Sequence, residues 1–401
     1  MDMRTTDRAA RACRLTRAEA LWALGVCGLS MGTRPTLWAA SGGAPARRLS
    51  PADGATEANA PRSSHLSASL PVSDATIQVA APLVRLLYQD PSIAIRGMRS
   101  TGATGANALW ERGRRREWYI EEQRAGEPAA IGGIVTRDRA AVEGALRLFD
   151  WGFRRQAVDG RFAGTADPFH STSFFVAAVA HTCLFARQAA DVGLFPLAAA
   201  YRQRIARYAP LAQRAARWMT QPGVWSAGLA GNSPFTHRRY LVGAALGLTG
   251  LLSDDRALID RAHEVIDEGL ALQRADGVNP ERGGHDSSYQ MTGVVFAQYW
   301  ATYLPDDPLT PRVRAMIERA VRWEGTRVEP AGAVSAQGNT RTAGQEPGRD
   351  GVIKSVAYSR VIRGFATWGV MTGDARWTTL AWRIGRYYYA SPALAARPLL
   401  P

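Results

Sequence analysis

Four polar, glycine-rich connectors resemble one another, and each leads into a segment that is apolar on nearly every side. The connectors occupy residues 167–173, 231–240, 282–289 and 349–358, and the segments after them read VAAVAHTCLF, LVGAALGLTG, TGVVFAQYWA and VIRGFATWGV. A helix that is apolar all round must be buried. The pattern therefore predicts repeated helical hairpins, each with one buried member.

Apolar residues recur at the i, i+3, i+4 spacing of helices over most of the chain after about residue 75. Strictly alternating runs are scarce, and only residues 76–99 are ambiguous. Repeated hairpins that stack form a solenoid or close into a ring, so the expected fold is all-α, an incomplete or complete α/α toroid. The predicted helices are 140–155, 173–192, 197–219, 239–252, 256–274, 287–303, 311–323 and 352–371.

Residues 1–46 have the three parts of an export signal. Arginines at positions 4 to 17 form a basic region, residues 20–31 are a short apolar core, and Ala44-Pro45-Ala46 is a small-x-small cleavage site. The apolar core is too short for a permanent membrane anchor. We therefore expect a periplasmic or secreted protein after cleavage near Ala46, with an arginine-rich mitochondrial presequence as the alternative. Residues 47–74 read as a flexible linker, which leaves 75–401 as the catalytic domain.

The formal net charge of +14 comes almost entirely from arginine, because Lys354 is the only lysine. Arginine suits bidentate binding of carboxylate or phosphate, and a basic surface admits an acidic polymer, nucleic acid or an anionic membrane. Expected export and the lack of a known binding motif argue against nucleic acid. Cys13, Cys27 and Cys183 do not have zinc-site spacing, so we expect neither metal nor cofactor.

In a ring of hairpins, the N-termini of the buried helices open onto one face. Each N-terminus carries partial positive charge and free N–H donors, which favour an anionic ligand. The long polar segment 331–351 between two helices suits a lid or a subsite floor. The substrate-binding residues predicted from these features are His170, Arg239, Tyr240, Asn339, Arg341, Lys354 and Tyr358.

The span from Trp218 to Trp300 resembles the toroidal polysaccharide lyases, and in particular the alginate lyases of the α/α-barrel type. That family carries an Asn-His pair opening one inner helix, and an Arg and a Tyr two helical turns apart at a later one. Here His237 follows Asn232, with Thr236 directly before the histidine. The second spacing is reproduced by Arg282 and Tyr289.

The resemblance implies β-elimination from a uronate-containing polysaccharide. The proton next to a uronate carboxylate is weakly acidic, so preorganised donors and positive charge must stabilise the enolate. Asn232, His237 and Arg282 are the candidates for that role. Tyr289 would act as both base and acid in a syn elimination, and His237 or His285 is the base in a variant mechanism.

Two other functions suit the same fold. An inverting glycoside hydrolase needs two carboxylates on opposite sides of its substrate, and Asp167, Asp286 and Asp350 lie in three of the four connectors. A non-catalytic protein that binds acidic polysaccharide would need no such groups. We rank the lyase first, because the connectors hold more Arg, His and Tyr than acids.

Overall fold

The computed structural model describes residues 91–104, 119–165, 167–342, 346–347 and 353–390, together with Leu83 and Leu86. The chain separates into two units, residues 1–68 and 69–401, and every described residue belongs to the second. The expected export signal, 1–46, and the expected linker, 47–74, lie outside the described residues.

The described part of the chain is helical, which confirms the all-α class; β-pairing there is limited to isolated bridges. The elements, in chain order, are η1 (Pro91–Ile95), α5 (Tyr119–Glu122), η2 (Gln123–Ala125), α6 (Gly126–Thr136), α7 (Arg139–Phe153), α8 (Pro168–Asp191), α9 (Pro196–Ala206), α10 (Tyr208–Met219), α11 (Pro222–Asn232), α12 (Thr236–Ser253), α13 (Arg256–Leu272), α14 (Ser287–Tyr303), α15 (Thr310–Gly325), α16 (Tyr358–Thr372) and α17 (Ala375–Ala390).

Periodicity located most of these helices, and α14 agrees with its prediction at both ends. The helix expected over 197–219 is two helices, α9 and α10, which meet at Arg207. The helix expected from residue 352 begins only at Tyr358. Helices α5, α6, α11 and α17 were not predicted. Helix α11 was missed because it contains three glycines, which have low helix propensity and interrupt the apolar repeat.

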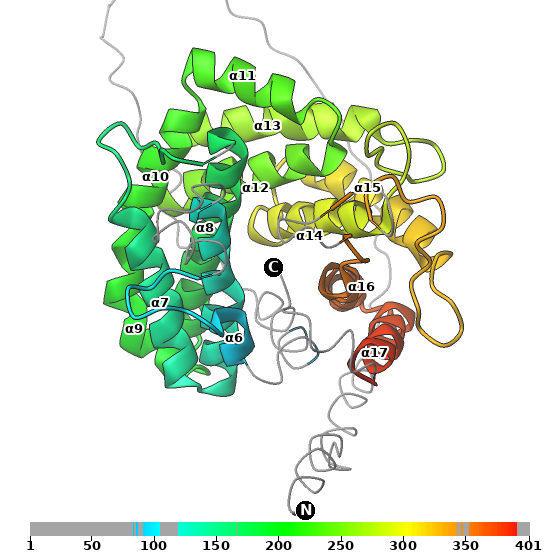
Figure 1. Cartoon of the computed structure of the whole chain (residues 1–401), viewed down its shortest axis with the longest axis horizontal. Helices are drawn as coiled ribbons and strands as arrows, with labels where there is room; N and C mark the ends of the chain where they lie inside the picture. Colours follow the sequence, from blue (N-terminus) through cyan, green and yellow to red (C-terminus); the bar gives the residue numbers. More distant parts are fainter. Residues whose placement is uncertain are drawn as a thin grey trace, which may run out of the picture. The chain divides into compact units, whose positions relative to one another are not determined.

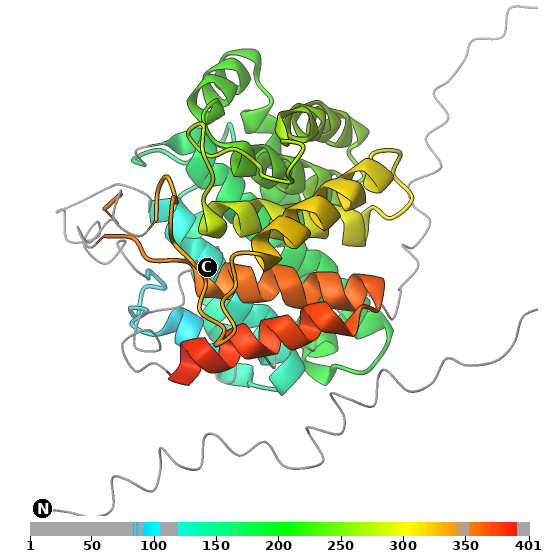
Figure 2. The same cartoon turned by 90° about the vertical axis from the view of Figure 1, so that its right-hand side faces the viewer.

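Helices α6, α8, α12, α14 and α16 lie side by side in this order, and each contacts the next (Figures 1 and 2). Each also packs against the helix that follows it in the sequence: α7 on α6, α9 on α8, α13 on α12, α15 on α14 and α17 on α16. The repeated hairpin predicted from the connectors is therefore the unit of this fold.

Small residues allow the buried helices to approach closely. A methyl group on Gly247 of α12 would come 2.4 Å from the ring of Trp300 on α14, and one on Gly243 would come 2.4 Å from Ile266 on α13. Trp300 itself is fully buried. A side chain at either glycine would force these helices apart, because protein interiors have no spare volume.

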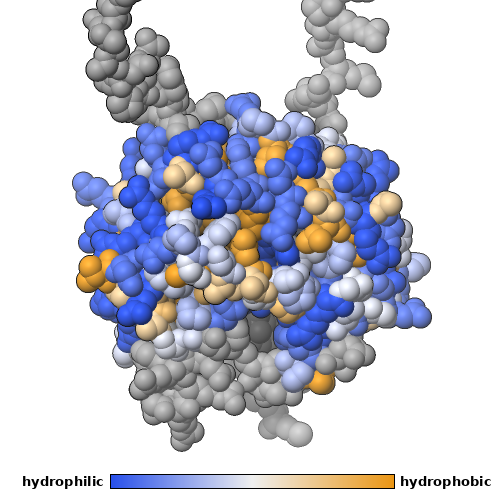
Figure 3. All heavy atoms as spheres, turned by 90° about the horizontal axis from the view of Figure 1, so that it is seen from above, coloured by the Kyte–Doolittle hydropathy of each residue, from blue (hydrophilic) through white to orange (hydrophobic). Residues whose placement is uncertain are grey.

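The partner helices have the one-sided pattern of surface helices. In α13 one face is buried through Leu258, Ile259, Val265 and Ile266, while most of the other positions are charged. Seen from above, the molecule is mainly hydrophilic with scattered hydrophobic side chains (Figure 3). By contrast, α8 is long and apolar enough to cross a membrane, but its apolar window is entirely buried within the fold, as in a core helix.

A buried ionic group joins four of the helices in the buried series. The carboxylate of Glu127 on α6 accepts hydrogen bonds from Tyr299 of α14 at 2.5 Å and from Arg363 of α16 at 3.2 Å. The imidazole Nδ1 of His181 on α8 lies 2.8 Å from the same oxygen. Burial alone would raise the pKa of Glu127, but the charge of Arg363 and the hydrogen bonds lower it to about 2. This ion pair links α16 back to α6.

Candidate functional site

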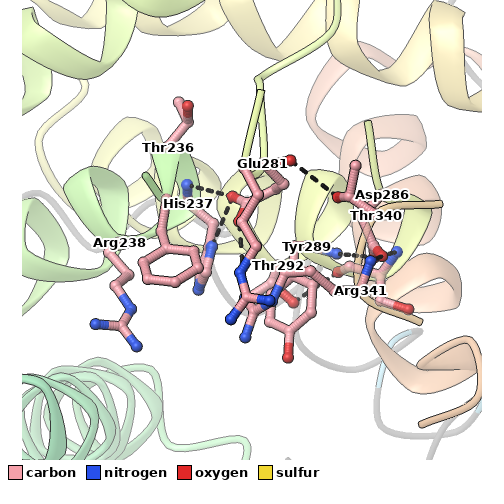
Figure 4. A network of polar contacts seen from close by, with 12 residues as sticks. Thr236, His237, Arg238, Glu281, Asp286, Tyr289, Thr292, Thr340 and Arg341 are labelled. Atoms are coloured by element: carbon pink, nitrogen blue, oxygen red, sulfur yellow. Dashed lines mark hydrogen bonds and ion pairs between the residues drawn. The ribbon is translucent and has the colours of Figure 1, made fainter. Parts of the chain in front are cut away.

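Polar residues that are far apart in the sequence converge at the N-terminal ends of α12 and α14 (Figure 4). The group comprises one residue from each of these helices, and the others come from the segments that precede α14 and α16. We call this group the polar cluster, and its members are His237, Glu281, Tyr289, Arg341, Glu346 and Lys354.

The centre of the polar cluster is a buried pair formed by His237 and Glu281. One carboxyl oxygen of Glu281 accepts the backbone N–H of His237 at 3.0 Å, and the same oxygen lies 2.7 Å from the imidazole Nδ1. A carboxyl oxygen can accept two N–H groups, so the His237 tautomer with its proton on Nδ1 can donate to the same oxygen. The imidazole then keeps a free lone pair on Nε2, which is the state that a general base requires.

Burial controls the protonation of this pair. Burial and the charge of Arg341 lower the pKa of His237 well below its usual range. Burial raises the pKa of the Glu281 carboxyl to about 8, although the backbone N–H of His237 and the charge of Arg341 act in the opposite direction. Below pH 8 both groups are therefore mainly neutral.

Tyr289 is held between the histidine and two cations. Its ring centroid lies 4.7 Å from that of His237, and the guanidinium carbon of Arg341 lies 3.6 Å from the ring centroid of Tyr289. Lys354 Nζ donates to the phenolic oxygen at 3.2 Å. Two cations therefore lie against Tyr289, one over its ring and one on its hydroxyl.

Glu346 fixes the cations. Arg341 binds it through Nε at 2.8 Å and through Nη2 at 3.2 Å, and Lys354 is ion-paired with it. Burial would raise the pKa of Glu346, but the hydrogen bonds from Arg341 and Lys354 lower it to about 2. Arg282 lies at the margin, with its guanidinium 3.7 Å from Glu346 and half exposed. The carboxylate is thus ionised throughout the neutral range.

Several buried polar atoms at the site have no hydrogen-bond partner among the described residues. Nη1 of Arg341 and the second carboxyl oxygen of Glu281 are two of them, and they lie 3.7 Å apart. The amide nitrogen of Asn232 and Nε of Arg238 are two more. Unsatisfied buried donors are uncommon in proteins, and these three nitrogens are donors suited to a carboxylate.

Asp286 positions the segment that carries Arg341. Its carboxylate is completely buried and caps α14 through the backbone N–H groups of Ser288 and Tyr289. Its other oxygen accepts the backbone N–H groups of Arg341 at 3.0 Å and Thr342 at 2.8 Å, as well as the Thr342 hydroxyl. Asp286 is therefore a positioning residue, since all of these contacts are structural.

The structure brings together several of the residues predicted from the sequence. His237, Tyr289, Arg341 and Lys354 belong to the polar cluster, and Arg282 adjoins it. Two others lie next to these. Asn232 accepts a hydrogen bond from Arg238 at 3.1 Å, and His170 is buried against Phe174. Burial and the charge of Arg238 lower the pKa of His170 well below its usual range.

The other predicted residues have structural contacts instead. Arg239 binds backbone carbonyls at the end of α11, and Tyr240 is core. Asn339 accepts the N–H of Ser287, and the hydroxyl of Tyr358 accepts the N–H of Val334. The side chain of His285 contacts Trp323 and the carbonyl of Gln337, rather than any member of the polar cluster.

Of the three acids proposed for a hydrolase, Asp286 is fully committed to the contacts described above. Asp167 caps α8 through the N–H of His170 and lies 3.3 Å from Arg238. Asp350 lies outside the described residues. Within the part of the chain that the structure describes, no three His, Cys, Asp or Glu side chains are grouped to hold a metal.

Sequence reasoning missed Glu281 and Arg238. Glu281 lies between Pro280 and Arg282 in an irregular segment, where no periodicity indicates which way a side chain points. Its direction is set by a turn in which Arg282 has φ 50°, an unusual value for a residue other than glycine. Strained backbone of this kind concentrates at functional sites, but it is not visible in a sequence.

Comparisons with protein-family models, with curated proteins and with solved structures each give no match. The geometry of the polar cluster is therefore the basis for assigning a function.

Proposed function

We propose that this protein is a polysaccharide lyase that cleaves a uronate-containing acidic polysaccharide by β-elimination. The observation that carries the proposal is the contact between His237 and Tyr289, whose rings are 4.7 Å apart within a group of cations. The proposed architecture is an α/α toroid. The series of hairpins and the Glu127–Arg363 ion pair between α6 and α16 support it.

In the proposed reaction, Nε2 of His237 removes the proton on the carbon next to the uronate carboxylate. The electrons of that C–H bond form the new double bond, and the bond to the glycosidic oxygen breaks. Tyr289 donates its hydroxyl proton to this leaving oxygen, and the ammonium of Lys354 stabilises the phenolate that remains. Because the two side chains are neighbours, both act from one face of the sugar, which suits a syn elimination.

The cations supply the electrostatic part of catalysis. The enolate that forms carries its charge on the oxygens of the substrate carboxylate, and donors already in place there lower the barrier. Arg341 is suited to this role because its Nη1 has no hydrogen-bond partner among the described residues, while its other nitrogens are held by Glu346. Asn232 and Arg282 are the secondary candidates. Glu346 keeps the guanidinium fixed, so little reorganisation is needed.

The test is ultraviolet absorbance, which detects the conjugated double bond of an unsaturated uronate. The purified protein is incubated with a panel of acidic polysaccharides beside its Tyr289→Phe variant. We expect absorbance to rise with the unsubstituted protein and the rate to fall by about 100-fold or more in the variant, the typical effect of losing a general acid. Tyr303→Phe is the matched control, because Tyr303 lies on the same helix and its buried hydroxyl has no partner among the described residues.

Two results would overturn the lyase. New reducing ends without absorbance would indicate a hydrolase, and binding without any product would indicate a non-catalytic binding protein. An equal loss of rate in both tyrosine variants would show that Tyr289 has no specific part in the reaction.

A further inference from the structure

Arg360 is a buried charge without a counter-ion of its own. It lies in the first turn of α16, and only 5% of its surface is exposed. Among the described residues, its guanidinium has no ion-pair or hydrogen-bond partner; its nearest ring is Phe296, with the centroid 5.6 Å away. A buried arginine is costly unless an anion accompanies it. The fold therefore holds a guanidinium whose partner is still to be supplied.

The charges around Arg360 do not supply that partner. The carboxylate of Glu127 is already bound by Arg363, His181 and Tyr299. The neighbouring Arg124 is itself a cation, with Glu121 as its ion-pair partner. Burial first, and then the charge of Arg363, lowers the pKa of Arg360, whereas the charge of Glu127 acts in the opposite direction. An oxyanion bound here would accept hydrogen bonds from the guanidinium of Arg360.

Arg360 lies about two helical turns along α14 from the polar cluster. Phe296, which contacts Arg360, follows Tyr289 by seven residues on α14, so the two are roughly 10 Å apart along the helix axis. The Phe296 ring lies 5.8 Å from that of Phe174 on α8, which in turn contacts His170 at 4.9 Å. The two phenylalanines thus form a row of contacts between Arg360 and His170.

We propose that Arg360 anchors a second oxyanion subsite, which takes a carboxylate of the acidic polymer one or more sugar units away from the bond that is cut. The identity of the polymer rests on the proposed lyase function, whereas the oxyanion chemistry rests on Arg360 itself. A guanidinium binds a carboxylate through two parallel hydrogen bonds. Occupancy of this subsite would select substrates that carry charge on more than one unit, and would favour longer fragments over disaccharides.

The experiment is calorimetric titration with a disaccharide and a hexasaccharide of the same polyuronate, in a Tyr289→Phe background that slows turnover. Arg360→Met keeps most of the side-chain volume and removes the charge. We expect it to weaken hexasaccharide binding at least tenfold and to leave disaccharide binding unchanged. Arg376→Met is the matched control, because Arg376 is an exposed arginine paired with Asp374. Arg360→Lys, which keeps the charge, should recover part of the affinity, and circular dichroism verifies the fold of each variant.

A second arm uses sulfate alone and follows thermal unfolding. Sulfate that stabilises the unsubstituted protein but not Arg360→Met, together with unchanged hexasaccharide affinity, would assign the subsite to a free anion and overturn its role in polymer binding. If Arg360→Met and Arg376→Met have the same oligosaccharide affinity and the same response to sulfate, the proposed subsite is wrong. If no polymer yields an unsaturated product, the proposed lyase function is wrong. The proposed subsite is still supported in that case, provided that Arg360→Met weakens hexasaccharide binding.

Discussion

Glu281 determines how His237 behaves. The two side chains share a buried contact of 2.7 Å, and below pH 8 both are mainly neutral. As the pH rises through about 8, Glu281 becomes a carboxylate. A carboxylate on Nδ1 stabilises the imidazolium that forms when Nε2 takes a proton, and so makes Nε2 a stronger base.

We therefore expect kcat/KM of the unsubstituted protein to rise as the pH passes through about 8. In Glu281→Gln this rise should be absent, because glutamine accepts the same hydrogen bonds without ionising. Initial rates between pH 6 and 9.5 give the pH dependence of kcat/KM for both proteins. Glu268→Gln is the control, since Glu268 pairs with Arg239 away from the polar cluster. The same rise in Glu281→Gln would assign the transition to another group.

Among the elements, the contact between α14 and the segment 339–342 is the most important for the site. Asp286 begins the helix and binds the N–H groups of Arg341 and Thr342, so a single buried carboxylate determines where both the helix and the arginine lie. An N-cap normally stabilises only its own helix. Here the same side chain also holds the segment 339–342 in place.

Replacing Asp286 with alanine should therefore destabilise the protein more than the loss of an ordinary helix cap does. We expect the free energy of unfolding to fall by about 3 kcal/mol, because several buried N–H donors lose their acceptor. In Asp138→Ala, where the cap of α7 accepts one N–H from Ala141, the fall should be about 1 kcal/mol. Urea unfolding followed by circular dichroism gives both values. Equal losses would show that the segment does not depend on Asp286.

Local sequence predicted the elements better than the side-chain contacts. The helix at Ser287 and the convergence of the connectors follow from periodicity and caps, because these are short-range properties. Whether Arg239 or Arg238 faces the site depends on one helical step of about 100°, which a loose motif does not fix. Glu281 reaches His237 through a turn whose geometry is set by contacts 44 residues apart. These long-range contacts are what the sequence alone does not reveal.

Across the whole molecule, the buried group around Glu127 ties the early helices to the late ones. Removing Arg363 would leave the carboxylate buried without its cation. We expect Arg363→Met to lower the free energy of unfolding by about 3–5 kcal/mol. Arg204→Met removes a cation from a more exposed pair with Glu143 and Asp150 and should cost at most about 1 kcal/mol. Similar losses in both variants would contradict a special role for the buried group.

The same carboxylate predicts an acid dependence of stability. Its pKa is about 2 in the folded protein and 4.5 when unperturbed, so the unfolded state binds the proton more readily. The stabilisation is complete above pH 4.5 and is lost progressively as the pH falls towards 2. In Glu127→Gln this part of the decline should disappear. Unfolding free energies measured from pH 7 to 2.5 provide the comparison, and an unchanged decline would assign it to other acids.

The pairing of Glu127 with Arg363 also has a consequence for synthesis. The two residues are 236 positions apart, so the ribosome has made most of the domain before the guanidinium emerges. Until then, burial of the helix that carries Glu127 would leave its carboxylate without the arginine that pairs with it. This cost opposes early folding of the nascent chain. We therefore expect native structure to form only once translation has reached α16.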